Sequence, residues 1–190
     1  MIKQTAEIFE LLSKGGFISS DSTDPHIRQL YNQIDGNLTE LYEHYASINF
    51  FLESGKEYYY FSRRETRAEL ESKLEIAMRW IDVLDFVKTY DNAFAPGFRF
   101  QPSDILVRLK LDAELKEKLG GLKKYTGKEK QDEILEKVLN DLKRDGFIEL
   151  ENEITSTYKV VAAFNYLEEL VTCINIPEEH IISVISFYHK

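Results

Sequence analysis

The sequence predicts a mainly helical α+β fold with small β-hairpins, because a helix that leads directly into a hairpin occurs twice along the chain. The clearer copy spans residues 134–161, where leucine and valine recur at helical spacing and Gly146 supplies the left-handed residue that ends a helix. Two strand-like stretches follow at once, at 147–151 and 156–161, and a polar turn joins them.

The second copy spans residues 38–62, where a helix leads into an aromatic hairpin with strands at 49–53 and 58–62. A helix followed by a hairpin is how a winged helix-turn-helix domain ends. We therefore predict tandem winged helix-turn-helix domains joined by a long helix. The predicted parts are a first domain at 1–63, a second domain at 64–173 that includes the long helix at 64–90, and a C-terminal extension at 174–190.

The first domain is predicted to place three helices before its hairpin. A helix over about 3–14 is followed by a short strand at 17–19, which can pair with the hairpin. Asp24 precedes a proline and is expected to cap the second helix. Asn37 and Glu40 have the spacing of a reciprocal capping box at the start of the third. Four residues of that third helix are expected to face the core: Leu38, Leu41, Tyr45 and Ile48.

The long helix over 64–90 is predicted to take part in a subunit interface. Its apolar residues follow one another at intervals of four and three, as in a helix seam: Leu70, Leu74, Ala77, Ile81 and Leu84. A second apolar face begins at Trp80. We therefore expect this helix to be covered on two sides, either by both domains or by a subunit partner.

The rest of the second domain is predicted from turn signals and helical spacing. Its expected elements are a short strand at 98–100, one helix carrying apolar residues from Ile105 to Leu115, a glycine- and lysine-rich loop at 120–127, the helix and hairpin of the clearer copy, a helix at 162–173 and a short element at 178–188.

Composition limits the classes of function. The 190 residues are 43% apolar, which suffices for a core, and 33 acidic against 24 basic residues give a net charge of -9. Nucleic acid should therefore be repelled by the chain as a whole. No apolar run approaches the roughly 18 residues of a membrane span, so we expect a cytoplasmic protein. The single cysteine, Cys173, lies in an apolar run and is expected to be a buried thiol.

Basic residues gather at three places: a net-positive loop, and two positions where winged-helix proteins often meet phosphates. Only the segment 93–130 is net positive, and its loop lysines fit either a solvated loop or a phosphate-contacting patch. The candidate DNA contacts are Lys123, Lys124, Lys128 and Lys130 in this patch, Lys143 and Arg144 at the end of the following helix, and Arg63, Arg64 and Arg67 after the first hairpin. The helix itself carries Asp and Glu where base-reading side chains would be expected, which favours a protein-binding face.

The aromatic strand at 58–62 is the second candidate for a protein interface. In a half-buried strand Tyr58 and Tyr60 face one way, and Tyr59 and Phe61 face the other. The strand could stack on bases, but packing is the better interpretation, with one aromatic pair left for an interface. The candidate interface residues are Tyr58, Tyr60, Leu70, Leu74 and Ile81.

The sequence carries no pattern typical of an enzyme or a metal site. A phosphate-binding loop is excluded at 121–128, because five residues separate the first glycine from the Gly-Lys pair and Glu129 replaces the required Ser or Thr. The four histidines lack metal-ligand spacing. We predict no catalytic residue, no metal and no cofactor.

Three segments resemble the MukE/MksE family, the tandem winged-helix subunits of bacterial condensin-like SMC complexes and of the related Wadjet systems. They are residues 37–45, 57–63 and 139–148, and the similarity extends from Gly15 to about Val171. The resemblance implies a protein without catalysis that forms a homodimer and binds a kleisin, the subunit that links it to an SMC ATPase. It also implies modest DNA contact that does not depend on sequence.

Our leading hypothesis is therefore a non-enzymatic, kleisin-binding accessory subunit that acts in chromosome organisation and segregation or in plasmid defence, associated with the nucleoid. The alternative is a dimeric winged-helix transcription regulator, which would bind an operator with two half-sites.

Overall fold

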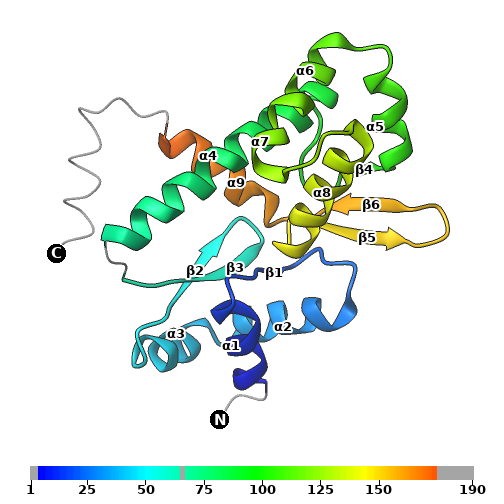
Figure 1. The fold of residues 1–190 in the computed structure, drawn as a ribbon. Coiled ribbons are helices and arrows are strands. Elements are labelled where there is room, and N and C mark those ends of the chain that lie inside the picture. The colour runs from blue at the N-terminus through cyan, green and yellow to red at the C-terminus, as the bar shows by residue number, and fades with distance from the viewer. Residues whose placement is uncertain (1–3, 65–66, 175–190) are drawn as a thin grey trace.

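The computed structural model describes residues 4–64 and 67–174, with side chains at all of them except 67–73 and 173–174. The expected mixture of helices and small antiparallel sheets is confirmed (Figure 1). The first half contains α1 (Thr5–Ser13), β1 (Ile18–Ser19), α2 (Pro25–Gly36), α3 (Leu38–Ala46), β2 (Phe51–Gly55) and β3 (Tyr58–Ser62). The expected element at 178–188 lies outside the described residues, as does the side chain of Cys173.

The first sheet has the strand order β1-β3-β2, with both pairs antiparallel. Gly55 pairs with Tyr58, so the hairpin turn consists of two residues and is shorter than predicted. Gly55 has to be glycine, because a Cβ there would lie 1.9 Å from the ring of Tyr58. The pairing of residues 17–19 with the hairpin is confirmed, since Ile18 lies opposite Tyr59.

The second half repeats the order of helix and hairpin with more helices. Its elements are α4 (Arg67–Tyr90), β4 (Arg99–Phe100), α5 (Pro102–Leu109), α6 (Ala113–Gly121), α7 (Lys123–Thr126), α8 (Gln131–Arg144), β5 (Ile148–Asn152), β6 (Thr157–Val160) and α9 (Phe164–Ile174). The second sheet has the order β4-β6-β5. Gly146 has a φ of 80°, which confirms the predicted left-handed residue after α8.

Two expectations for the second half were wrong. The helix predicted from Pro102 to Leu115 is two helices, because the Asp112 side chain accepts a hydrogen bond from the Leu115 backbone N–H (2.9 Å) and so caps α6. Leu111, at the junction, is largely exposed. The predicted loop at 120–127 contains the short helix α7, which Gly127 ends with a φ of 65°.

The capping box predicted at Asn37 is also wrong. The Asn37 side chain makes no cap for α3 and instead donates to the Gln33 carbonyl oxygen (2.9 Å), at the end of α2. Asn37 follows the last residue of α2 directly and precedes the first residue of α3. Its side-chain N–H serves the C-terminal end of α2, and its side-chain oxygen makes no cap hydrogen bond at the start of α3.

Strand β3 lies between two hydrophobic clusters and contributes a face to each. Tyr59 and Phe61 pack into the cluster built by α1, α2 and α3, whereas Tyr58 and Tyr60 pack into the cluster of the second half. The predicted alternation of the aromatic residues is therefore confirmed. Both faces are covered by the chain itself, because Phe17 and Tyr166 pack on Tyr60 and because Phe9 and Tyr45 pack on Phe61.

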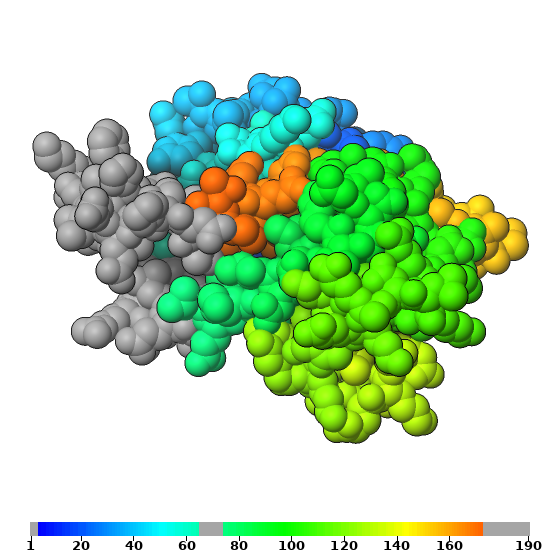
Figure 2. All heavy atoms as spheres, turned by 90° about the horizontal axis from the view of Figure 1, so that it is seen from above, coloured from blue at the N-terminus to red at the C-terminus, as the bar shows by residue number. Residues whose placement is uncertain are grey.

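Polar contacts join the two halves around the aromatic strand. Glu149 on β5 accepts hydrogen bonds from the Ser22 hydroxyl (2.8 Å) and the Thr23 hydroxyl (2.6 Å). Asp21 accepts from the Ala162 backbone N–H (2.8 Å) and pairs with Lys159 (3.1 Å). Figure 2 shows α9 lying between the hairpin of the first sheet and the helices of the second half. These contacts fix the position of one half against the other.

Candidate interaction surfaces

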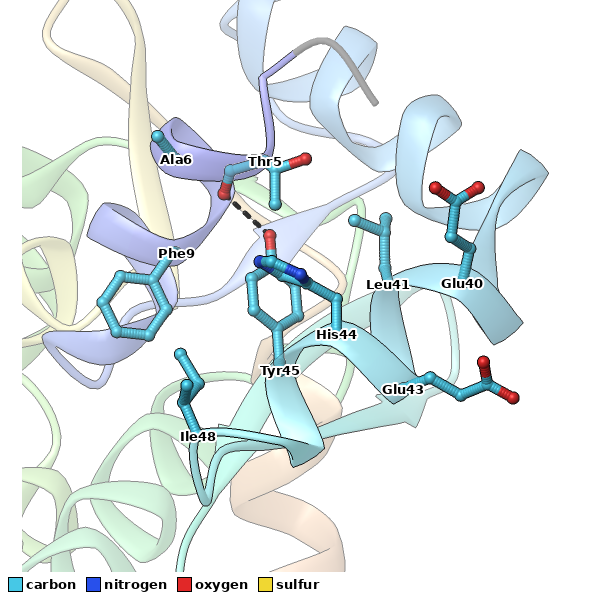
Figure 3. Close-up of a pocket in the computed structure, with 9 residues that line it drawn as sticks. All are labelled: Thr5, Ala6, Phe9, Glu40, Leu41, Glu43, His44, Tyr45 and Ile48. Atoms are coloured by element: carbon cyan, nitrogen blue, oxygen red, sulfur yellow. Dashed lines mark hydrogen bonds between the residues drawn. The ribbon is translucent and has the colours of Figure 1, made fainter. Parts of the chain in front are cut away.

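The first candidate surface is an open groove between α1 and α3 with a volume of about 740 Å³ (Figure 3). Helix α3 and the residues after it supply Leu41, Tyr45 and Ile48, which recur at intervals of four and three and so share one face. Helix α1 supplies Ala6 and Phe9 from the opposite side. The groove is therefore apolar over most of its length.

The floor of the groove is held in place by the buried Tyr45 and by two half-buried aromatic residues, Phe9 and Phe50. The Tyr45 hydroxyl donates to the Thr5 carbonyl oxygen (2.7 Å), and burial raises the pKa of Tyr45 to about 12, so the phenol stays a neutral donor. The Phe9 ring stacks on Tyr45 at 6.1 Å and meets Phe50 edge-on at 4.9 Å. This packing joins α1, α3 and the start of the hairpin.

One end of the groove is acidic. Glu40 and Glu43 extend from α3 at the end opposite Phe9 and Ile48 (Figure 3), and both are exposed. Neither carboxylate has an ion-pair partner among the residues that the structure describes. Helix α3 contains no Lys or Arg at all. A nucleic-acid backbone would therefore be repelled from this helix.

The expectation that four residues of α3 face the core was correct only for Leu41 and Tyr45, which are buried. Ile48 is 49% exposed at the rim of the groove, and Leu38 is also exposed. The periodicity identified the apolar face of the helix, but it could not show that α1 covers this face only in part.

Most lysines of the predicted basic patch are paired with acidic side chains. Lys124 contacts Asp82 (2.9 Å), Lys130 contacts Glu133 (3.3 Å), and Lys123 contacts Glu129. Although burial acts in the opposite direction, hydrogen bonds from Lys124 and Tyr125 lower the pKa of Asp82. Lys128 has no ion-pair partner in the described part of the chain. The patch is thus close to neutral around most of its lysines.

The two basic residues at the end of α8, Lys143 and Arg144, also differ in whether a carboxylate is paired with them. Arg144 pairs with Asp141 (2.8 Å) and with Asp145 (2.7 Å), so its charge is used within the protein. Arg79, whose guanidinium lies 4.6 Å from the centre of the Trp80 ring, reaches the same two aspartates. Lys143 is exposed, and within the described residues it has no such partner.

The arginines after the first hairpin make no contact with the lysine patch among the residues that the structure describes. Arg63 is exposed, and its guanidinium lies 5.4 Å from the centre of the Phe50 ring. Arg64 is also exposed. Arg67 begins α4, and its side chain lies outside the described residues.

The second candidate surface lies on the N-terminal half of α4. Leu74, Ile76 and Met78 are 55%, 50% and 48% exposed, whereas Ala77 and Leu84 are buried. Ile81 is half-buried, and the side chain of Leu70 lies outside the described residues. The predicted seam therefore runs from an exposed end into the core of the second half. Ile76 and Met78 were missed because they do not fit the seam's spacing.

Tyr58 cannot contact a partner in this structure, because its side chain is 1% exposed. Its hydroxyl donates to Glu169 on α9 (3.1 Å), and burial raises its pKa. Tyr60 is half-buried between Phe17 and Tyr166. Tyr58 therefore joins the two halves of the same chain, whereas the half-buried Tyr60 stays a predicted interface residue.

No group of three or more His, Cys, Asp or Glu side chains is placed to hold a metal ion among the described residues. None of the helices in the described ranges has both the length and the apolar character that a membrane crossing needs. The groove is partly apolar with an acidic end, and three of the four lysines of the predicted patch are paired with carboxylates, which suits a protein partner better than nucleic acid.

A comparison with known protein families agrees with a surface suited to a protein partner. Residues 3–171 match the family described as condensin complex protein MksE, and the chain therefore belongs to this family. A search of curated proteins found no match.

Proposed function

We propose that this protein is a non-enzymatic accessory subunit that binds the kleisin of a bacterial condensin-like SMC complex. The observation that carries the proposal is the match to the MksE family over residues 3–171. A kleisin bound to this subunit would connect it to the SMC ATPase. Its role would be in chromosome organisation and segregation or in plasmid defence, in the cytoplasm and at the nucleoid.

We interpret the two halves as tandem winged helix-turn-helix domains, at 1–63 and 64–173. The interpretation is supported by the order of elements, since each half has a helix that leads directly into a hairpin with a third short strand beside it. In this scheme α3 and α8 occupy the positions of recognition helices, and α4 connects the domains. Residues 174–190 form the proposed C-terminal extension.

Two copies of the chain would join through α4. The proposed homodimer is supported by three exposed apolar residues of this helix, Leu74, Ile76 and Met78. Large apolar side chains contribute favourable free energy to association when an interface removes them from water. Leu70 and Ile81, the other two predicted interface residues of α4, lie before and after these three in the same helix.

DNA contact would be weak and independent of sequence. Among the predicted contacts whose side chains the structure describes, Lys128, Lys143, Arg63 and Arg64 have no carboxylate partner, while Lys123, Lys124, Lys130 and Arg144 are paired with carboxylates. The same charge pattern speaks against a transcription regulator, because α3 presents Glu40 and Glu43 where such a protein presents basic residues.

Purification of the tagged protein from its native host, followed by mass spectrometry, tests the proposal. We expect the kleisin and the SMC ATPase of one complex to be recovered together. Recovery of one short DNA sequence without these proteins would contradict the proposal and support the regulator.

A further inference from the structure

We propose that the groove between α1 and α3 binds an apolar segment of a partner protein that carries Lys or Arg beside its apolar anchor. This inference rests on the proposed function, in which the partner is the kleisin. It deepens that function by naming one surface and the chemistry of the segment that occupies it.

The apolar end of the groove calls for an apolar side chain. Figure 3 shows Ala6, Phe9 and Ile48 gathered at this end, contributed by α1 and by the residues after α3. Ile48 leaves nearly half of its surface in water although the groove beside it has room for a side chain. Covering such surface is favourable in proportion to the apolar area removed from water.

The acidic end of the groove selects the charge of the occupant. Glu40 and Glu43 lie three residues apart on α3, so their carboxylates share one side of the helix. Neither carboxylate is paired with a Lys or Arg among the described residues, and the only basic side chain on α3 is His44, which also lines the groove, so a Lys or Arg of the partner would supply a permanent positive charge. An acidic segment, a nucleic-acid strand or a carboxylate-bearing metabolite would be repelled.

The shape of the groove favours a peptide over an enclosed small ligand. The groove is open to solvent along α3, and its apolar and acidic ends follow one another along the helix (Figure 3). A peptide can place an apolar anchor at one end and a basic side chain at the other, in the manner of a short amphipathic segment in a groove.

The test measures binding of overlapping fluorescent peptides from the host's kleisin to the full-length protein by anisotropy. The charge-reversal variant is Glu40→Lys with Glu43→Lys, and Ile48→Asp alters the apolar end. Glu136→Lys with Glu153→Lys is the matched control, because both glutamates are exposed on the second half of the chain. Circular dichroism checks that each variant is folded.

We expect one peptide with an apolar residue near Lys or Arg to bind, and we expect each groove variant to weaken it by about tenfold while the control does not. The loss from charge reversal should shrink at high salt.

If the intact kleisin and its peptides bind all variants equally, the groove is not the site, although kleisin binding stands. Recognition of an acidic peptide would likewise overturn the inference. If the wild-type protein binds neither the kleisin nor any of its peptides, the proposed function fails and the groove inference fails with it.

Discussion

At the scale of single residues, Glu149 is the acceptor that joins the two halves of the chain. It accepts from the side chains of Ser22 and Thr23, and Ser22 is buried. Glu149→Ala removes this acceptor and leaves the donors of the buried Ser22 and the half-buried Thr23 unpaired, so we expect the free energy of unfolding to fall by about 1–3 kcal/mol. Urea unfolding measures the change, with the exposed Glu153→Ala as control. Equal stability of the two variants would contradict this role.

His26 and Glu7 provide a pH-dependent contact between α1 and α2. The hydrogen bond that the His26 ring donates to the Glu7 carboxylate raises the pKa of His26 above its ordinary 6.5, so the contact stabilises the fold fully below that pH and is lost as the pH rises through the raised pKa. We expect Glu7→Gln to return the His26 pKa toward 6.5 in an NMR titration. The stability difference between wild type and variant should also fade with rising pH. A His26 pKa unchanged by the variant would exclude the contact.

The sequence predicted single residues well where one local signal decides the outcome. Asp24, Gly146 and the alternating Tyr58–Phe61 strand are confirmed. It failed at Asn37, whose side chain donates to the end of α2 and makes no cap for α3. It also failed where a distant element decides what covers a surface, since the buried state of Tyr58 depends on Glu169 and Phe17.

At the scale of elements, α4 carries the prediction of a homodimer. We expect Ile76→Asp to raise the dimer dissociation constant by tenfold or more, because burying an isoleucine is worth about 1.5–3 kcal/mol. Light scattering at several protein concentrations measures the shift. Leu111→Asp is the control, since Leu111 is a largely exposed leucine away from α4. A dimer unaffected by Ile76→Asp would move the interface elsewhere.

Around α7 and α8, lysines that are paired with carboxylates and lysines that are not are expected to contribute differently to DNA binding. We expect Lys128→Ala to reduce the salt dependence of binding to duplex DNA by about one phosphate contact, and Lys124→Ala to leave it nearly unchanged. Anisotropy with a labelled duplex at several salt concentrations measures both. Equal effects would mean that pairing with Asp82 does not withhold Lys124 from DNA.

Element boundaries were predictable to within a few residues except between 102 and 127. There the apolar residues continue from α5 into α6 without a proline or glycine, and only the Asp112 cap marks the break. The groove between α1 and α3 was not predictable for a different reason. Its existence depends on the angle and distance between two helices, which no local pattern encodes.

At the scale of the whole molecule, the shared strand β3 and the contacts around it predict that both halves unfold together. Trp80, the single tryptophan, lies in the second cluster, so its fluorescence reports that half, whereas far-UV circular dichroism reports both. We expect the two signals to change in one coincident urea transition. Two separated transitions would show that the halves are independent.

The association with a kleisin is the central claim, and light scattering on the purified chain mixed with its host's kleisin tests it most directly. We expect a stable complex whose mass corresponds to two copies of this chain with bound kleisin. If the masses measured at micromolar concentration correspond only to the two separate proteins, the claim is contradicted.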